Sequence, residues 1–271
     1  MGKAVYYFFV FIFYQIASAF VIGIIAGIFW PVSSATAHIA QLCIVSAVAS
    51  LLTLVTSYWA KWYAASPEYI KSKPYRVLLW SVMLSLGLII PLTWLQEMLP
   101  DKWTQDLMQA EFSVLLKSPM GYLVIGLIAP IVEEVVFRGA ILRALLEWGK
   151  ENMSEGIKGV WTCIIISALL FSIAHFNPAQ MPHAFVIGCI LGWMYWRTGS
   201  IIPGIMFHLT NNTVAFVIAG MFPDIPYDAK LPAYFNGDES AVIMAVICSL
   251  IIALPCLWRL NILMKRKTES L

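Results

Sequence analysis

Residues 119–145 read PMGYLVIGLIAPIVEEVVFRGAILRAL, an apolar stretch with two adjacent acids and a nearby base in its second half. A membrane-spanning helix needs about 20 consecutive, mainly apolar residues, and this stretch is long enough. Glu133, Glu134 and Arg138 interrupt it, although an ionisable side chain inside a span costs roughly 2.5–3.5 kcal/mol on insertion scales. Charged residues in such a place are functional candidates by default. The stretch therefore predicts a transmembrane helix that carries part of a functional site.

The composition of the whole chain agrees with a membrane protein. Of the 271 residues, 61% are hydrophobic and 12% are charged, and the mean hydropathy is +0.81. Soluble domains carry about 25% charged and about 45–50% apolar residues, so this chain has too little polar side chain to coat one. The formal net charge of +2 comes without a basic stripe, which predicts no nucleic-acid partner.

The apolar stretches predict an all-α polytopic membrane protein with about eight transmembrane helices and the site inside the bundle. The predicted spans are residues 5–29, 37–60, 76–96, 119–145, 160–176, 181–197, 201–220 and 241–263. Residues 101–117 mix apolar and charged side chains and predict an interfacial amphipathic helix. We find no repeat and no soluble domain. The chain is therefore expected to be a single transmembrane domain over residues 1–271, with a motif-bearing catalytic core over about 119–220.

The basic residues predict the orientation of the chain in the membrane. Lys and Arg gather in alternate connections between spans, as they do in cytoplasmic loops. These residues are Lys61, Lys71, Lys73, Arg76, Arg143, Lys150, Lys158, Arg197, Arg259, Lys265, Arg266 and Lys267. The charge bias places both termini in the cytoplasm, and the even number of spans agrees, since it puts the termini on the same side. The membrane is expected to be a cell inner membrane or one like the endoplasmic reticulum.

The two glutamates of residues 119–145 cannot have the same role, because they face different directions. Adjacent side chains of an α-helix point about 100° apart. Glu134 and Arg138 are four residues apart with the acid first, which is the favoured order for an ion pair. We expect Arg138 to pair with Glu134, and Glu133 to face the bundle interior as a general acid or base. A purely structural ion pair is the alternative.

Two further polar clusters stand in later spans. Phe171 and His175 close residues 160–176, and a histidine can deprotonate water near neutral pH. His208 and Asn212 are four residues apart and project from one helix face, where two donors suit a developing oxyanion. Each cluster alone also fits an interfacial histidine or polar side chains that hold helices together. Together the three clusters supply the groups that peptide-bond hydrolysis needs.

The order of the motifs resembles a known family. Glu-Glu-x-x-x-Arg, Phe-x-x-x-His and His-x-x-x-Asn, on separate spans, are similar to the motifs of the CAAX proteases and bacteriocin-processing enzymes. That family, also called Abi, includes the Ras-converting prenyl-protein endopeptidases. All three motifs are present here, with Arg138 and Phe171 at supporting positions.

The resemblance implies an eight-helix intramembrane protease of the glutamate type, with no metal and no cofactor. In such an enzyme Glu133 and His175 would activate the attacking water. His208 and Asn212 would stabilise the oxyanion of the tetrahedral intermediate, and Glu134 would support the catalytic set. The implied partners are the lipid bilayer and a membrane-embedded or lipid-anchored protein or peptide substrate.

The residues by themselves leave three alternatives open. Glu133, His175 and His208 are of the types that bind zinc in catalytic sites, although no His-Glu-x-x-His motif is present. An ion- or proton-coupled transporter would also bury Glu, Arg and His, although we see no matching pair of halves. A non-catalytic relative that acts as a membrane scaffold or immunity protein would keep the same polar network for packing.

Helix lengths place the candidate residues at different depths. At about 1.5 Å per residue, Glu133 lies roughly 18 Å, His208 roughly 10 Å and His175 roughly 22 Å from the cytoplasmic ends of their spans. If these residues share one site, the fifth span must be tilted, shorter than predicted or bounded differently.

Overall fold

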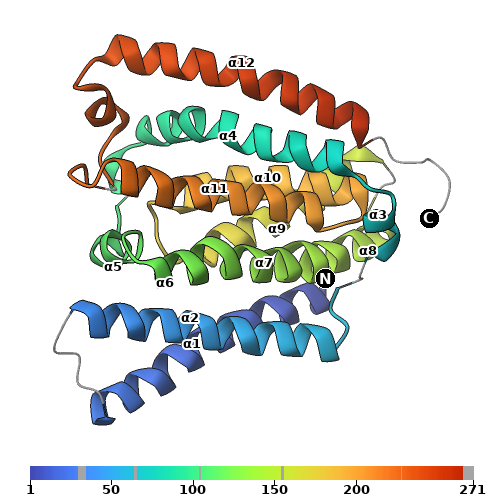
Figure 1. Ribbon diagram of the computed structural model, residues 1–271. Helices are drawn as coiled ribbons and strands as arrows, with labels where there is room; N and C mark the ends of the chain where they lie inside the picture. Colours follow the sequence, from blue (N-terminus) through green and yellow to red (C-terminus); the bar gives the residue numbers. More distant parts are fainter. Residues whose placement is uncertain (30–34, 64–65, 104, 154–155, 227, 265–271) are drawn as a thin grey trace. The chain divides into compact units, whose positions relative to one another are not determined.

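All regular elements in the described residues are helices (Figure 1). The computed structural model describes residues 1–29, 35–63, 66–103, 105–153, 156–226 and 228–264. The all-α class is therefore confirmed. Lys265, Arg266 and Lys267, which contributed to the predicted orientation, lie outside the described residues.

Six helices in the described part of the chain are long and apolar enough to cross a membrane. They are α1 (Gly2–Phe29), α2 (Ala35–Trp59), α4 (Tyr75–Glu97), the continuous helix Pro119–Asn152, α11 (Ile202–Met221) and α12 (Glu239–Leu263). The other two predicted spans are helical too. Helix α9 (Ile157–Ile173) is apolar but has 17 residues, and α10 (Met181–Thr198) carries His183 and Arg197. A polytopic membrane protein is confirmed, and the count of eight spans stays a prediction.

The described chain separates into two compact units. The first unit comprises Met1–Ala64, Met108–Cys163 and Asn212–Tyr227, and the second comprises Ala65–Leu107, Ile164–Asn211 and Asp228–Leu271. The chain passes from one unit to the other within α9 and within α11. The single transmembrane domain, with its core over about 119–220, stays a prediction.

The helix Pro119–Asn152 is the central element of the first unit. It contacts α1 and α2, and 50% of its apolar stretch is buried, more than in the other five candidate spans. Phe11 of α1 packs edge-on against Phe137, with ring centroids 5.4 Å apart. Tyr14 and Thr56 share a hydrogen bond of 2.8 Å that joins α1 to α2.

Two parts of this central helix are π-helical. Its consecutive parts are α6 (Pro119–Gly121), η2 (Tyr122–Ile128), α7 (Ala129–Glu134), η3 (Val135–Leu142) and α8 (Arg143–Asn152). The π-helical parts are η2 and η3. A π-helix is rare, and where one occurs it often lies at a functional site. Pro130 has no N–H, so the carbonyl of Gly126 cannot accept the usual α-helical bond, and the helix widens just before the proline. Both glutamates therefore lie in a short α-helical part between two π-helical ones.

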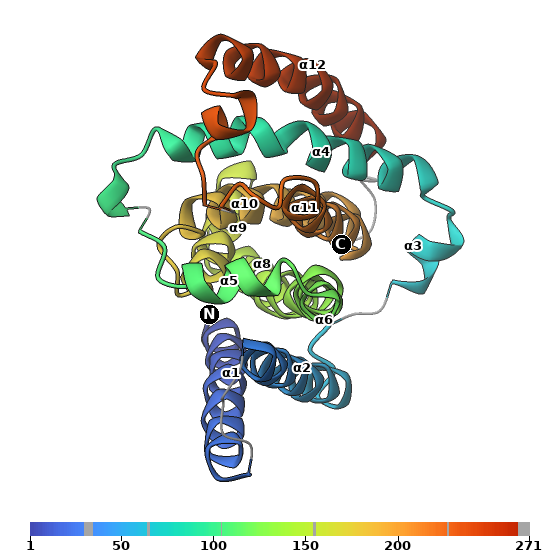
Figure 2. The ribbon, with the colours of Figure 1, turned by 60° about the vertical axis from the view of Figure 1, so that its left-hand side comes forward.

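The second unit is built on the packing of α4 against α12, which run side by side in both views (Figures 1 and 2). A Cβ atom at Gly87 would lie 2.9 Å from the backbone nitrogen of Ala253, so only a glycine allows this approach. Arg197 of α10 donates to the carbonyl oxygens of Asn261 at 2.6 Å and Met264 at 2.8 Å. These bonds satisfy carbonyls at the end of α12 that have no partner within their own helix.

Four short helices complete the described chain: α3 (Pro67–Lys71), η1 (Asp101–Trp103), α5 (Gln109–Leu115) and η4 (Leu231–Phe235). The single interfacial helix predicted over residues 101–117 is therefore wrong, because η1 and α5 are separate. The backbone between η1 and α5 forms a hydrogen bond to a side chain in another segment. The N–H of Leu107 donates to the side-chain oxygen of Asn177 at 3.2 Å.

Candidate active site

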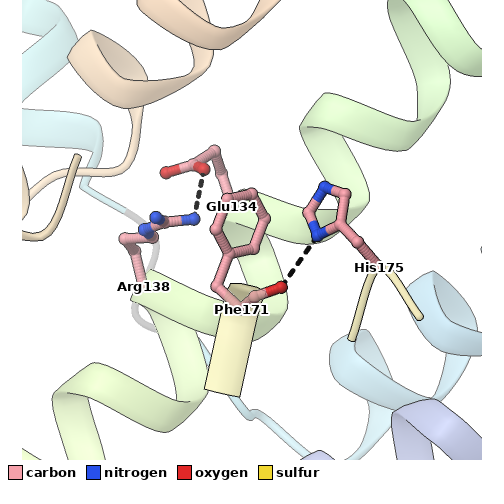
Figure 3. A network of polar contacts seen from close by, with 4 residues as sticks. All are labelled: Glu134, Arg138, Phe171 and His175. Atoms are coloured by element: carbon pink, nitrogen blue, oxygen red, sulfur yellow. Dashed lines mark hydrogen bonds and ion pairs between the residues drawn. The ribbon is translucent and has the colours of Figure 1, made fainter. Parts of the chain in front are cut away.

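The predicted ion pair of the glutamate motif is present in the first unit. Arg138 Nη1 donates to Glu134 Oε1 over 2.7 Å (Figure 3). The two side chains are 1% and 0% exposed. Removing one partner of a buried ion pair costs about 3–5 kcal/mol, because the other charge is left uncompensated. The neighbouring Glu133 is only half-buried, so the two glutamates occupy different environments, as the helix geometry predicts.

His175 lies in a turn rather than in a helix. Helix α9 ends at Ile173, so the predicted fifth span is too long at this end. Phe176 has a φ of 51°, a left-handed conformation that ends the helix. The Nδ1 atom of His175 lies 2.8 Å from the carbonyl oxygen of Phe171 (Figure 3). A carbonyl can only accept, so Nδ1 carries the proton and Nε2 of the neutral ring is the acceptor.

The ring of Phe171 contacts both histidines of the second and third motifs. It is 1% exposed, and its centroid lies 4.8 Å from that of His175 and 5.7 Å from that of His208. The interplanar angles are 90° and 87°, which are edge-to-face contacts. The second unit therefore places His175 and His208 against one ring. Helix lengths predicted different depths for His175 and His208, yet the two side chains contact the same ring.

Asn212 is anchored in the first unit by its side-chain amide. Its Nδ2 donates to the carbonyl oxygen of Ile125 in η2 over 3.1 Å. The next residue, Thr213, shares a hydrogen bond of 3.3 Å with the hydroxyl of Tyr122. The motif residues thus divide between the units: His175 and His208 lie in the second. The others belong to the first unit: Glu133, Glu134, Arg138 and Asn212.

Sequence reasoning missed several polar residues beside the histidines. Asn177 is 0% exposed, and its Nδ2 donates to Asp106 over 2.8 Å. His183 Nε2 lies 3.4 Å from Asn211 Oδ1. The Asn-Pro dipeptide at Asn177 is a turn signal that could have pointed to its role. Nothing in the sequence paired Asn177 with Asp106, because the two residues belong to different segments.

Comparisons with known proteins point to the same segment. Residues 115–214 match the family described as "Type II CAAX prenyl endopeptidase Rce1-like", and all three motifs fall within this range. A relative named "Putative membrane peptidase YdiL", from Bacillus subtilis (strain 168), is 29% identical over 110 residues. The alignment covers 41% of this chain and 41% of that relative. No solved structure matches the chain at a comparable level of significance. The predicted resemblance to the CAAX-protease and bacteriocin-processing family is therefore confirmed over residues 115–214.

Proposed function

We propose that this chain is an intramembrane endopeptidase of the glutamate type. Its substrate would be a membrane-embedded or lipid-anchored protein or peptide, in which it hydrolyses a peptide bond. The observation that carries the proposal is the placement of His175 and His208 against the ring of Phe171. These residues lie within the segment that resembles a CAAX prenyl endopeptidase.

Glu133 and His175 activate the attacking water in the proposed mechanism. The bond from Nδ1 to the carbonyl of Phe171 supports this role, because it leaves Nε2 of a neutral His175 as a proton acceptor. Glu133 is the half-buried member of the glutamate pair and is the proposed general base. General acid–base catalysis of this kind contributes about 10²–10⁴-fold to the rate.

His208 and Asn212 supply donors to the oxyanion of the tetrahedral intermediate. His208 is 5% exposed and is held by Phe171, while the amide of Asn212 is oriented by its bond to Ile125. Groups that are oriented before the reaction stabilise developing charge better than groups that must move, and one such donor is worth about 10²–10³-fold in kcat. The buried Glu134–Arg138 pair supports this arrangement by holding the helix that carries Glu133.

The proposed mechanism needs no metal or other cofactor. Glutamate and histidine supply the base, and the oxyanion donors are neutral side chains, so the substrate carbonyl is polarised by hydrogen bonds. The competing zinc mechanism would use Glu133, His175 and His208 as ligands. The two mechanisms predict opposite responses to a chelator.

Both termini are proposed to lie in the cytoplasm, in an inner membrane or one like the endoplasmic reticulum. The alternate placement of basic residues supports this orientation, and described members of the set include Lys61, Arg143 and Arg259. Reporter fusions at each terminus and at residues 221–240 test it. Termini on the opposite side from the cytoplasm would overturn the orientation without affecting the catalytic proposal.

The decisive experiment measures cleavage of a panel of fluorogenic membrane peptides by the purified chain in detergent. Wild type is compared with Glu133→Gln and with Glu147→Gln, each with and without a zinc chelator. Glu147 is a matched control, because it is a glutamate on the same continuous helix. Its side chain is 58% exposed, and its Oε1 lies 3.5 Å from Nε of the partly exposed Arg143. We expect activity that survives chelation, is lost in Glu133→Gln and is retained in Glu147→Gln.

Other outcomes point to the alternatives. Activity that disappears with chelation and returns with zinc would replace the proposed mechanism with a zinc-dependent one. A wild-type protein that cleaves no peptide, but moves protons across liposomes in a Glu133-dependent way, would be a transporter. If the biological effect of the chain survives Glu133→Gln in cells, the scaffold or immunity role is favoured.

A further inference from the structure

The turn between α9 and α10 contains a fully buried polar side chain that the proposed mechanism does not use. Asn177, two residues after His175, is 0% exposed. Its Nδ2 donates to Asp106 Oδ1 over 2.8 Å. Its Oδ1 accepts from the backbone N–H of Leu107 at 3.2 Å and from that of Ala179 at 3.4 Å. Both ends of the carboxamide are therefore engaged, as a buried amide requires.

The backbone of Asn177 also contacts the start of the next helix, α10. Its carbonyl oxygen accepts from the N–H groups of Gln180 at 2.9 Å and Met181 at 3.2 Å. A second attachment comes from α4, where Gln96 Nε2 donates to the carbonyl of Ala179 over 2.8 Å. The turn is thus fixed by bonds from the segment around residues 106–107 and from the end of α4.

His175 depends on this turn for its position. The residue lies beyond the end of α9, and its backbone N–H donates to the carbonyl of Ser172 over 3.2 Å. The next residue, Phe176, adopts a left-handed conformation that is unfavourable for a bulky side chain. Such a backbone persists where the surroundings hold it, and the bonds of Asn177 come directly after it.

We propose that Asn177 and Asp106 form a clamp that positions His175 for the reaction. Asn177 and Asp106 are positioning residues, since they act on the imidazole through the backbone of the turn. The inference rests on the proposed function, in which His175 activates the attacking water. A misplacement of about 1 Å in a reacting group can lower a rate by about 10²-fold, so a small shift of the turn is enough to matter.

The test variants change which residue donates and which accepts in the hydrogen bond between Asn177 and Asp106. Asn177→Asp keeps an oxygen for the N–H groups of Leu107 and Ala179 but turns the donor toward Asp106 into a second carboxylate oxygen. Asp106→Asn alone keeps an acceptor for the amide of Asn177 and serves as the matched control. Combining Asn177→Asp with Asp106→Asn reverses donor and acceptor and restores the pair.

The measured quantities are kcat and KM for the best peptide of the panel, with the thermal midpoint as a check on folding. We expect Asn177→Asp to lower kcat by about 10- to 100-fold with little change in KM. Asp106→Asn alone is expected to stay within about threefold of wild type, and the double variant to return to that range. Wild-type kcat in Asn177→Asp, or a double variant no better than Asn177→Asp, would overturn the clamp.

A second readout does not depend on turnover. In protein labelled with ¹⁵N-histidine, the Nδ1–H signal of His175, assigned by its absence in His175→Gln, reports the bond to Phe171. We expect this signal to shift or broaden in Asn177→Asp and to return in the double variant. An unchanged signal in Asn177→Asp would contradict the clamp. If Asn177→Asp does not fold, Asp106→Leu provides the same tests, since it removes the acceptor without adding a charge.

Failure of the clamp can be told from failure of the proposed function. His175→Ala is measured alongside. If His175→Ala cleaves as well as wild type, the proposed role of His175 is wrong. If His175→Ala is inactive while Asn177→Asp retains both kcat and the histidine signal, only the clamp is wrong.

Discussion

The imidazole of His175 is tied by a 2.8 Å hydrogen bond from its Nδ1 to the carbonyl oxygen of Phe171, four residues earlier. This bond fixes which nitrogen faces away from the helix end. We expect His175→Ala to lower kcat by about 10²–10⁴-fold, the usual contribution of a group that transfers a proton. The purified variant is assayed against the peptide panel, with His38→Ala of α2 as the histidine control. Equal loss in both variants would point to a general effect on folding.

Substitutions of the two adjacent glutamates are expected to affect different properties, turnover for Glu133 and folded yield for Glu134. Glu133→Gln should give folded protein without turnover, because the half-buried Glu133 is the proposed base. Glu134→Gln should instead lower the yield of monodisperse protein, since it leaves the buried Arg138 without its carboxylate. Size-exclusion profiles and activity per folded molecule separate the two. Normal yield with lost activity in Glu134→Gln would reverse the assignment of the two residues.

The buried ion pair can be tested by removing both of its members. Removing one charge is expected to cost about 3–5 kcal/mol, whereas replacing both by apolar side chains of similar size is often neutral or stabilising. We expect Glu134→Leu with Arg138→Met to have a higher thermal midpoint than either single variant. A double variant as unstable as the worse single variant would mean that further interactions of these side chains dominate.

Asn212 is expected to contribute to the rate as an oxyanion donor. Asn212→Ala should lower kcat by about 10²–10³-fold. The variant also loses the bond to the carbonyl of Ile125, so a structural control is needed. Thr213→Val provides it, because it removes the neighbouring bond to Tyr122 while leaving Asn212 in place. If both variants lose activity equally, Asn212 acts only by holding α11 against η2.

Helices α9 and α10 approach each other closely at Gly188, next to the ring of Phe171. A Cβ atom at Gly188 would lie 2.9 Å from the Cβ of Ala168 and 3.3 Å from Cδ1 of Phe171. We expect Gly188→Ala to destabilise the protein by about 1–3 kcal/mol through overpacking and to lower kcat by displacing Phe171. The control is Gly220→Ala, where a Cβ would meet nothing within 4 Å. Unchanged stability in Gly188→Ala would show that α9 and α10 can move apart without loss.

Much of the fold could be predicted from the sequence, for a physical reason. In a bilayer every backbone polar group must be satisfied within the protein, and a single apolar stretch of about 20 residues achieves this by forming a helix. All eight predicted segments are helical, from α1 to α12. The Glu134–Arg138 pair was also predictable, because it depends only on spacing along one helix.

The features that the sequence did not predict depend on contacts between distant segments. The end of α9 at Ile173 and the turn that carries His175 are held by Asn177, whose partner Asp106 is 71 residues away. The predicted helix over residues 101–117 fails for the same reason, since Leu107 bonds to Asn177 rather than within a helix. The π-helical winding of η3 has no local signal comparable to Pro130, which directly follows η2 in α7.

The packing of α4 against α12 has a consequence for how the chain is made. Gly87 belongs to the first third of the chain and Ala253 to its end, yet their backbones meet. The ribosome releases α4 and Arg197 well before α12, so the face of α4 around Gly87 and the guanidinium group both remain without these partners until α12 is made. Insertion helix by helix therefore cannot complete the second unit until α12 has been translated. A nonsense mutation that removes α12 would leave α4 without its partner.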